Sequence, residues 1–232
     1  YLERSGLNEE HLARVIVKNT RNAGSHGQSA APDVASVLRS DIISWPIRSL
    51  SRARDSDAAC AVILASDKKA RTLDREPVFV KGIGWSSDDG HLGRREQGTA
   101  RETVWAARQA YEMAGIRKPD REIDFAEVSD WYAHRELMHC EALGLCGPYD
   151  VASCQDRGVF ERDGALPVNA SGGLLGKGNS VCTSGLIRVA EAVQQVRGQA
   201  AECQIPGAEV GVAHSWGGVT EAAAGVTVLG RW

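Results

Sequence analysis

A glycine-rich stretch, SGGLLGKGNSVCTSG at residues 171–185, constrains the fold of this chain more than any other feature. It holds five glycines, and it leads directly into the helical pattern of residues 186–198. The N-terminus of a helix leaves backbone N–H groups unpaired, so an anion or a thiolate is favoured there. The stretch is therefore the first place to look for a functional site.

Two common nucleotide-binding loops do not match this stretch. A P-loop requires Ser or Thr after its Gly-Lys pair, whereas Lys177 is followed by Gly178 and the first P-loop glycine falls on Ser171. A dinucleotide fingerprint requires its third glycine where Val181 stands. The loop predicts neither a nucleoside triphosphate site nor a dinucleotide site.

Cys182 is the reactive side chain of the stretch. A cysteine at a helix N-terminus can be activated as a nucleophile, which makes Cys182 a candidate nucleophile. A buried cysteine instead behaves as a small hydrophobic residue and is inert. Both interpretations stay open at this point.

A cluster of histidines and cysteines follows residue 133 and raises the question of a metal site. Its spacings match no C-x-x-C or H-x-x-x-H pair, and neighbouring residues of a helix point in different directions, so the ligands would not converge. We expect no bound metal. The residues concerned are His134, His139, Cys140, Cys146 and Cys154.

Composition excludes several classes of partner. The net charge of −3 produces no field that would attract nucleic acid or an anionic membrane, and no apolar run reaches the roughly 18 to 20 residues of a membrane span. The six cysteines lack the dense spacing of a secreted disulfide scaffold. We expect a soluble, cytoplasmic protein without a nucleic-acid partner or a membrane span.

Hydrophobic periodicity predicts an α/β fold in which helices cover a mixed sheet. The pattern predicts Asn8 as the N-cap of the first helix and Gly115 as the end of the second. Residues 20–58 are expected to be irregular with one small helix. Helices are predicted over 8–19, 100–115, 134–144 and 186–198, and strands over 58–66, 77–87, 123–129, 209–215 and 223–230.

Motif matches occur in four stretches of the chain, at residues 55–66, 125–146, 166–200 and 211–230. Together these stretches resemble the thiolase superfamily, in particular the sterol-carrier-type thiolases. LPVNASGGLLGKGNSVCTSGLIRVAEAVQQVRGQA is similar to the thiolase segment N-x-x-G-G-x-x-x-x-G-H-P-x-G-x-[TS]-G and its following helix. FAEVSDWYAHRELMHCEALGLC resembles the strand and helix that carry H-D-C-F and E-x-L-G-L-C, and GVAHSWGGVTEAAAGVTVLG resembles the final pair of strands. DSDAACAVILAS is similar to D-G-A-A-A-V-V-L of the same enzymes.

The resemblance implies a layered fold built from two similar halves. Residues 77–232 correspond to the C-terminal domain, and residues 1–76 to a remnant of the loop domain with the end of the N-terminal half. The N-terminal half, which holds the acyl-accepting cysteine, has no counterpart in these residues. We therefore expect the isolated chain to be inactive.

Three motif positions of the family carry different residues here. The Asn or His that holds a catalytic water falls on Ser129, the His of G-H-P falls on Asn179, and the acid/base Cys falls on Ser215. Neither serine nor asparagine supplies a base near neutral pH, although Asn179 can still donate a hydrogen bond to a thioester oxygen. His214 or Tyr132 could transfer protons if their side chains turn inward; packing roles are the alternative.

The resemblance implies an enzyme that acts on acyl-CoA thioesters and makes or breaks a C–C bond, by acyl transfer or by retro-aldol cleavage. Coenzyme A thioester is then the substrate, and no cofactor is bound covalently. A homodimer or dimer of dimers is implied, as is a small partner protein with an OB-fold and zinc ribbon, as in the thiolase-like retro-aldolases of sterol breakdown. A non-catalytic scaffold subunit is the alternative. No motif identifies the CoA-binding residues.

Overall fold

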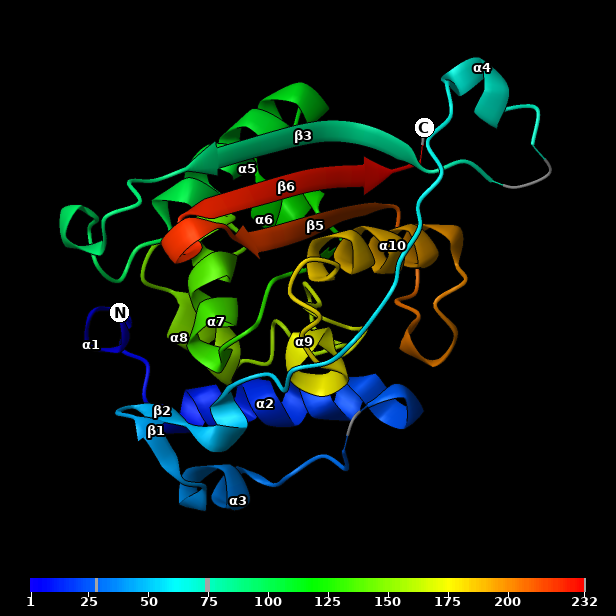
Figure 1. Ribbon diagram of the computed structural model, residues 1–232. Coiled ribbons are helices and arrows are strands. Elements are labelled where there is room, and N and C mark those ends of the chain that lie inside the picture. The colour runs from blue at the N-terminus through cyan, green and yellow to red at the C-terminus, as the bar shows by residue number, and fades with distance from the viewer. Residues whose placement is uncertain (28, 74–75, 232) are drawn as a thin grey trace.

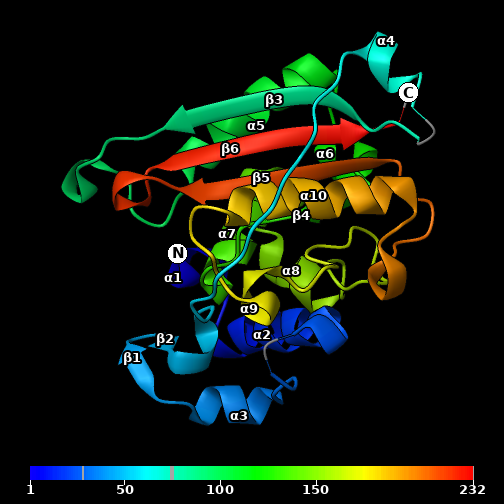
Figure 2. The same cartoon turned by 45° about the vertical axis from the view of Figure 1, so that its right-hand side comes forward.

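A four-stranded mixed sheet lies at the centre of the protein, which we describe from a computed structural model covering residues 1–27, 29–73 and 76–231. The strand order is β3–β6–β5–β4 (Figures 1 and 2; β4 is labelled in Figure 2). β6 pairs antiparallel with both β3 and β5, and β5 pairs parallel with β4. The strands span Phe79–Ser87 (β3), Phe125–Glu127 (β4), Val210–Gly217 (β5) and Ala223–Gly230 (β6).

Helix α5 (Arg101–Ala114) covers one face of the sheet, and α10 (Ser184–Arg197) covers the other (Figure 2). Two glycines of β3 let α5 lie directly on the strand: a Cβ on Gly82 or Gly84 would come within 2.0 Å of a carbonyl oxygen of the helix. Because side chains alternate along a strand, Val212 of β5 joins the core under α5, whereas Ala213 joins the core under α10.

Helix α2 (Glu9–Ala23) packs against the glycine-rich stretch through α9 (Gly173–Lys177). A Cβ on Gly176 would lie 2.6 Å from the backbone oxygen of Asn19, so a glycine is needed for this approach. The remaining helices are α1 (Leu2–Ser5), α3 (Val34–Arg39), α4 (Asp67–Ala70), α6 (Pro119–Glu122), α7 (Ala133–Ala142) and α8 (Val151–Asp156), and β1 (Ile42–Ser44) pairs with β2 (Ile47–Arg48).

The predicted α/β order is confirmed. Asn8 caps α2 by accepting hydrogen bonds from the N–H groups of Glu10 and His11, and the helix continues beyond the predicted end to Ala23. Gly115 ends α5 with φ at 74°. The helical turn α9 was not predicted, because glycines are poor helix formers. Glycine is needed here for the close contact with α2.

The strand predicted over residues 58–66 is wrong. The structure has no helix or strand there, and Ile63 and Leu64 are 93% and 82% exposed. The segment runs as an extended connection past α9 and α10 to α4 (Figures 1 and 2). An apolar run of this length forms a strand only where another strand accepts its hydrogen bonds, and none of the described strands lies beside it.

Within the described ranges, no helix is both long and apolar enough to cross a membrane. The same residues contain no group of three or more His, Cys, Asp or Glu side chains arranged to hold a metal ion.

Candidate active site

The glycine-rich stretch, the C-terminal end of β5 and the start of β6 surround a cavity of about 530 Å³, called here the site cavity. Five of the six candidate residues line it, and they come from segments far apart in the sequence: Ser129, Asn179, Cys182, His214 and Ser215. The structure therefore assembles most of the predicted positions in one place.

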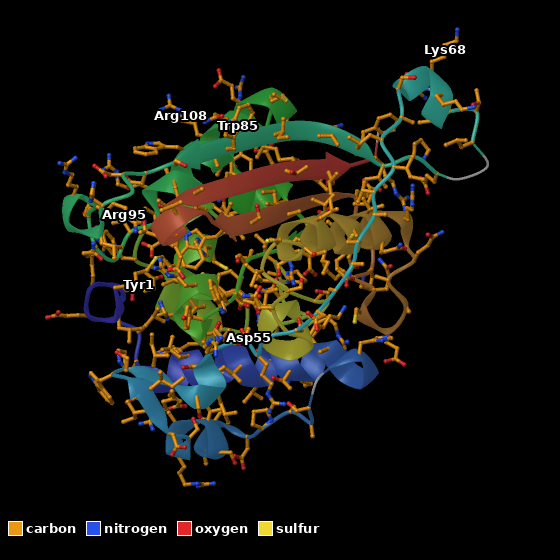
Figure 3. All side chains as sticks on the ribbon, viewed as in Figure 1. Tyr1, Asp55, Lys68, Trp85, Arg95 and Arg108 are labelled. Atoms are coloured by element: carbon orange, nitrogen blue, oxygen red, sulfur yellow. The ribbon has the colours of Figure 1, made fainter. Side chains whose placement is uncertain are left out.

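Asn179 is held rigidly at the wall of this cavity. Its backbone N–H donates to the carbonyl oxygen of Arg54 at 2.7 Å, and its carbonyl oxygen accepts from Ser56 at 3.0 Å. Figure 3 labels Asp55, the residue between these two partners, beside α9. The side-chain Oδ1 accepts from the N–H of Val181 at 3.0 Å and from the hydroxyl of Ser184 at 2.8 Å.

Because Oδ1 already accepts two hydrogen bonds, the side-chain donor of Asn179 that remains is its Nδ2 amino group. It forms no hydrogen bond with another described residue. Val181, which follows in the turn, has φ at 50°, a conformation that L-residues adopt rarely. The turn is therefore stabilised by Asn179 while its amide remains available to a ligand oxygen.

His214 is fully buried and faces α5 and α7, on the opposite side of β5 from α10. Its Nδ1 accepts from the N–H of Ser129 at 3.3 Å, so Nε2 carries the proton and donates to Thr103 Oγ1 at 3.2 Å. Thr103 in turn donates to Nδ1 of His139 at 3.1 Å. Burial, with a smaller contribution from Arg188, lowers the pKa of His214 to about 3. Its imidazole is neutral, and both nitrogens are engaged.

Ser215 faces the opposite side of β5, toward α10. A Cβ on Gly185 would lie 2.8 Å from the Cβ of Ser215, and a Cβ on Gly225 would lie 3.0 Å from its Oγ. The two glycines make room for the serine between helix and sheet. Its hydroxyl forms no hydrogen bond with another described side chain or backbone group.

Cys182 is exposed and lies just before α10. Tyr132 is not among the described residues that line the site cavity. Its ring stacks with that of Trp131, at a centroid distance of 5.7 Å, and with that of His134, at 5.8 Å. The neighbouring Trp131 lines the cavity instead, and its buried indole N–H has no partner among the described residues.

A network of buried charges supports the glycine-rich stretch from behind. Asp130 accepts from the N–H groups of Leu174 at 2.7 Å and Leu175 at 3.1 Å, and so it anchors the first turn of α9. Arg188 of α10 lies 3.9 Å from Asp130 and 3.6 Å from Glu127. Burial raises the pKa of Glu127 to about 6, against the lowering effect of Arg188.

Sequence reasoning missed Trp131 and Arg188. Trp131 stands in the same S-D-W-Y stretch as the candidate Ser129, so its position near the site could have been noticed. Arg188 follows Ser184 by one helical turn and therefore points to the same side of α10. On a helix whose outer face also carries charges, nothing marks this arginine as the buried one.

The architecture, a mixed sheet with a glycine-rich turn leading into its covering helix, defines a layered α/β domain with a cavity at the ends of two strands. Residues 84–231 match the family model described as thiolase C-terminal domain-like. The chain belongs to this family.

Curated relatives include an acetyl-CoA acetyltransferase of Methanothermobacter thermautotrophicus, 35% identical over 97% of this chain and 59% of that protein. Human sterol carrier protein 2 is 31% identical over 94% of this chain and 41% of that protein. A benzoylsuccinyl-CoA thiolase subunit, BbsB, of Thauera aromatica is 28% identical over 94% of this chain and 57% of that protein. The chain thus spans about half the length of these relatives.

Among solved structures, the one described as the Ltp2-ChsH2(DUF35) aldolase superposes with a TM-score of 0.84 at 23% identity, over 100% of this chain and 60% of that one. A monomeric SCP2-thiolase-like protein of Mycobacterium smegmatis superposes with a TM-score of 0.69 at 18% identity, over 99% of this chain and 48% of that one. At these identities the likeness concerns the fold.

Proposed function

We propose that the protein acts on acyl-CoA thioesters and makes or breaks a C–C bond next to the thioester, by acyl transfer or by aldol-type chemistry. The observation that carries this proposal is the amide of Asn179: its oxygen is occupied by two donors, and its Nδ2 is free at the wall of the site cavity. A fixed donor of this kind stabilises the negative charge that develops on a thioester oxygen when the neighbouring carbon becomes an enolate.

The other residues of the site cavity fit retro-aldol cleavage better than they fit a thiolase mechanism that uses the family's usual acid and base residues. Ser129 and Ser215 supply hydroxyl groups rather than bases, and both nitrogens of His214 are engaged in the interior. A retro-aldol cleavage needs an enolate-stabilising donor and one base, but no acyl-cysteine. Acyl transfer would instead use a nucleophilic cysteine, for which Cys182 is the candidate that the cavity exposes.

We propose further that the protein works in an assembly in the cytoplasm. The edge strand β3 exposes apolar side chains, including Trp85, which is 71% exposed and labelled in Figure 3. Such an edge supports a homodimer or dimer of dimers. The name of the Ltp2-ChsH2(DUF35) aldolase joins two components, which supports a partner chain for this protein as well. We propose that this partner is the small OB-fold and zinc-ribbon protein that the family resemblance implies. The described cysteines are all free, which supports a reducing compartment.

Calorimetric titration of the full protein, with every chain that co-purifies, against acetyl-CoA and free CoA tests the proposal. We expect acetyl-CoA to bind, and Asn179→Ala to weaken its binding about fivefold while changing CoA binding little, since one hydrogen bond to the thioester oxygen is worth roughly 1 kcal/mol. Gln199→Ala, at an exposed amide far from the cavity, is the matched control. Absence of acetyl-CoA binding by the intact assembly would overturn the proposal.

A non-catalytic scaffold subunit is the second candidate. It is favoured by the three replaced motif positions, because Ser129, Asn179 and Ser215 leave the cavity without the family's bases. In that case Asn179→Ala would leave the turnover of the whole assembly unchanged. A loss of turnover with the assembly intact by gel filtration would exclude the scaffold role.

A further inference from the structure

The turn between β5 and β6 holds two adjacent residues in a rare backbone conformation. Thr220 has φ at 52° and Glu221 has φ at 59°, a region that glycine tolerates and β-branched or long side chains avoid. The sequence V-T-E-A places no glycine at either position. Strained residues persist where the surrounding structure holds them, and they cluster at functional sites.

The loop that precedes α5 holds this turn in place. Arg95 donates from Nη2 to the carbonyl oxygen of Thr220 at 2.5 Å and from Nη1 to that of Glu221 at 3.3 Å. The hydroxyl of Thr220 donates to the carbonyl oxygen of Gly90 at 2.8 Å. Figure 3 shows Arg95 beside the turn, on the same side of the molecule as Tyr1. The strain is therefore maintained by specific contacts.

This backbone conformation places the Glu221 side chain at the wall of the site cavity. Among the described residues that line the site cavity, Glu221 is the one carboxylate. It also lines a neighbouring cavity of about 280 Å³, whose walls include the apolar side chains of Leu12, Ile47 and Met138. Glu221 thus stands where the site cavity meets a partly apolar space.

The carboxylate of Glu221 lies near the Arg135 guanidinium, but no hydrogen bond from a described residue occupies it. Arg135 Nη2 lies 4.0 Å from Oε2, too far for a hydrogen bond, and the Arg135 guanidinium is itself stacked 4.3 Å from the centre of the Trp216 ring. Neither oxygen of Glu221 accepts a hydrogen bond from another described residue. Both oxygens are free to take a proton from a ligand.

The other groups of the cavity do not offer this capacity. The hydroxyls of Ser129 and Ser215 and the amide of Asn179 are not bases near neutral pH. The Nδ1 lone pair of His214 is used by the N–H of Ser129, and its Nε2 carries the proton given to Thr103. Cys182 also lines the cavity, where its thiol is the candidate nucleophile for acyl transfer. Among the described oxygen and nitrogen groups of the cavity, the carboxylate of Glu221 is the one that remains as a base.

We propose that Glu221 is the general base of this site and acts on the carbon atom next to the thioester, an inference that rests on the proposed function. In the bond-forming direction, a Glu221 oxygen takes the α-proton of the acyl-CoA. The C–H electron pair moves into the thioester carbonyl, and the resulting enolate oxygen accepts the hydrogen bond of Asn179 Nδ2. The enolate carbon then attacks the carbonyl carbon of an aldehyde or ketone, the C–C bond forms as the C=O π bond breaks, and protonated Glu221 gives its proton to the new alkoxide.

In the cleavage direction the same group takes the proton of a β-hydroxyl. The C–C bond breaks, a carbonyl product forms, and the bond's electron pair becomes the enolate. Protonated Glu221 then returns its proton to the α-carbon. Protons and electrons balance in both directions without a cofactor.

Exchange of the α-protons of acetyl-CoA in D₂O, followed by mass spectrometry, tests this step without knowledge of the natural acyl group. We expect the full protein to catalyse exchange, and Glu221→Gln to slow it by about 100-fold or more while the Kd for acetyl-CoA changes little. Glu221→Gly is expected to fold well, because glycine adopts the observed φ without strain. Added formate should partly restore exchange in Glu221→Gly by supplying the missing carboxylate.

Glu112→Gln, at an exposed carboxylate on α5, is the control and should exchange at the normal rate. Binding of acetyl-CoA without exchange by the unaltered protein, or unchanged exchange by Glu221→Gln, would overturn the role of Glu221. Absence of acetyl-CoA binding would instead refute the proposed function itself, so the two failures are distinguishable.

Discussion

Lys18 and Glu136 form an ion pair in the interior of the protein, with Nζ and Oε1 2.6 Å apart and side-chain exposures of 1% and 0%. Lys18 also donates to the carbonyl oxygen of Val168 at 2.9 Å. The second carboxylate oxygen of Glu136 accepts from the amides of Asn19 and Asn169 at 2.5 and 2.7 Å. This pair therefore connects α2 and α7 to residues 168–169, which lead into the glycine-rich stretch.

Loss of one partner of this ion pair should be strongly destabilising. We expect Lys18→Met to lower the free energy of unfolding by about 3–5 kcal/mol, because Glu136 would remain buried without its counter-charge. Denaturant unfolding measures this. Lys68→Met, at the exposed lysine of α4 labelled in Figure 3, is the control and should be near neutral. Equal effects of the two substitutions would contradict the buried pair.

The low pKa of His214 should appear as a pH dependence of stability. Burial lowers its pKa to about 3 from the ordinary 6.5, so between these values the unfolded chain binds a proton that the folded protein does not. Stability conferred by this group therefore falls as the pH falls below 6.5, by on the order of 1 kcal/mol per pH unit. Burial raises the pKa of Glu127 to about 6. Its contribution to stability therefore changes in the opposite direction and increases as the pH falls.

Comparison with a variant isolates the contribution of His214. In His214→Asn, the side-chain oxygen can accept from the N–H of Ser129, and the titrating group is gone. Unfolding free energies measured between pH 7 and about 4.5 should fall less steeply than in the unaltered protein, whereas His91→Asn, at an exposed histidine, should reproduce the original slope. An unchanged slope in His214→Asn would mean that this histidine is not buried in its neutral form.

Gly185 should resist replacement, although alanine is the better helix former. At an open position in α10, Gly→Ala would stabilise by about 1 kcal/mol. At Gly185 the new Cβ would lie 2.8 Å from Ser215 Cβ, so we expect a destabilisation of about 1–3 kcal/mol. Thermal unfolding should show that Ser215→Gly added to Gly185→Ala recovers much of the loss. Gly93→Ala, with no atom within 4 Å of its new Cβ, is the control.

Cys182 should be the cysteine that reports occupancy of the site cavity. It is exposed and lines the cavity, whereas burial raises the pKa of Cys140 and Cys146 and keeps them as thiols. We expect iodoacetamide to label Cys182 first, as read by peptide mass spectrometry. Acetyl-CoA at ten times its Kd should slow this labelling about tenfold. Labelling that acetyl-CoA does not slow would separate Cys182 from the ligand-binding space.

Much of the fold could be predicted from local patterns. Cap residues and apolar spacing placed α2 and α5, and the α/β order followed from alternating helix and strand signals. The strand predicted over residues 58–66 was wrong because the apolar pattern shows only that a segment is hydrophobic. It does not record whether another strand is present to accept hydrogen bonds, and here Ile63 remains exposed.

The sequence led to some residues of the candidate site but not to others, because motif positions identify residues while tertiary contacts decide which of them line the cavity. Motif positions led to Ser129, Asn179 and Ser215, which come together at the cavity. Tyr132 was weighed for its chemistry, but its ring lies in a stack outside the cavity. Glu221 was missed because a glutamate in a turn is ordinarily solvated, and nothing in the residues V-T-E-A indicates a left-handed backbone.

The amino-acid sequence by itself determined which segments become helices and strands, because capping, glycine placement and apolar spacing act over a few neighbouring residues. It also identified the glycine-rich stretch as the entry to α10. Only the tertiary structure decided that Asn179 would keep a free amide, that His214 would be engaged on both nitrogens, and that Glu221 would reach the cavity. Those outcomes depend on contacts with Arg54, Thr103 and Arg95, residues distant in sequence that folding alone brings near.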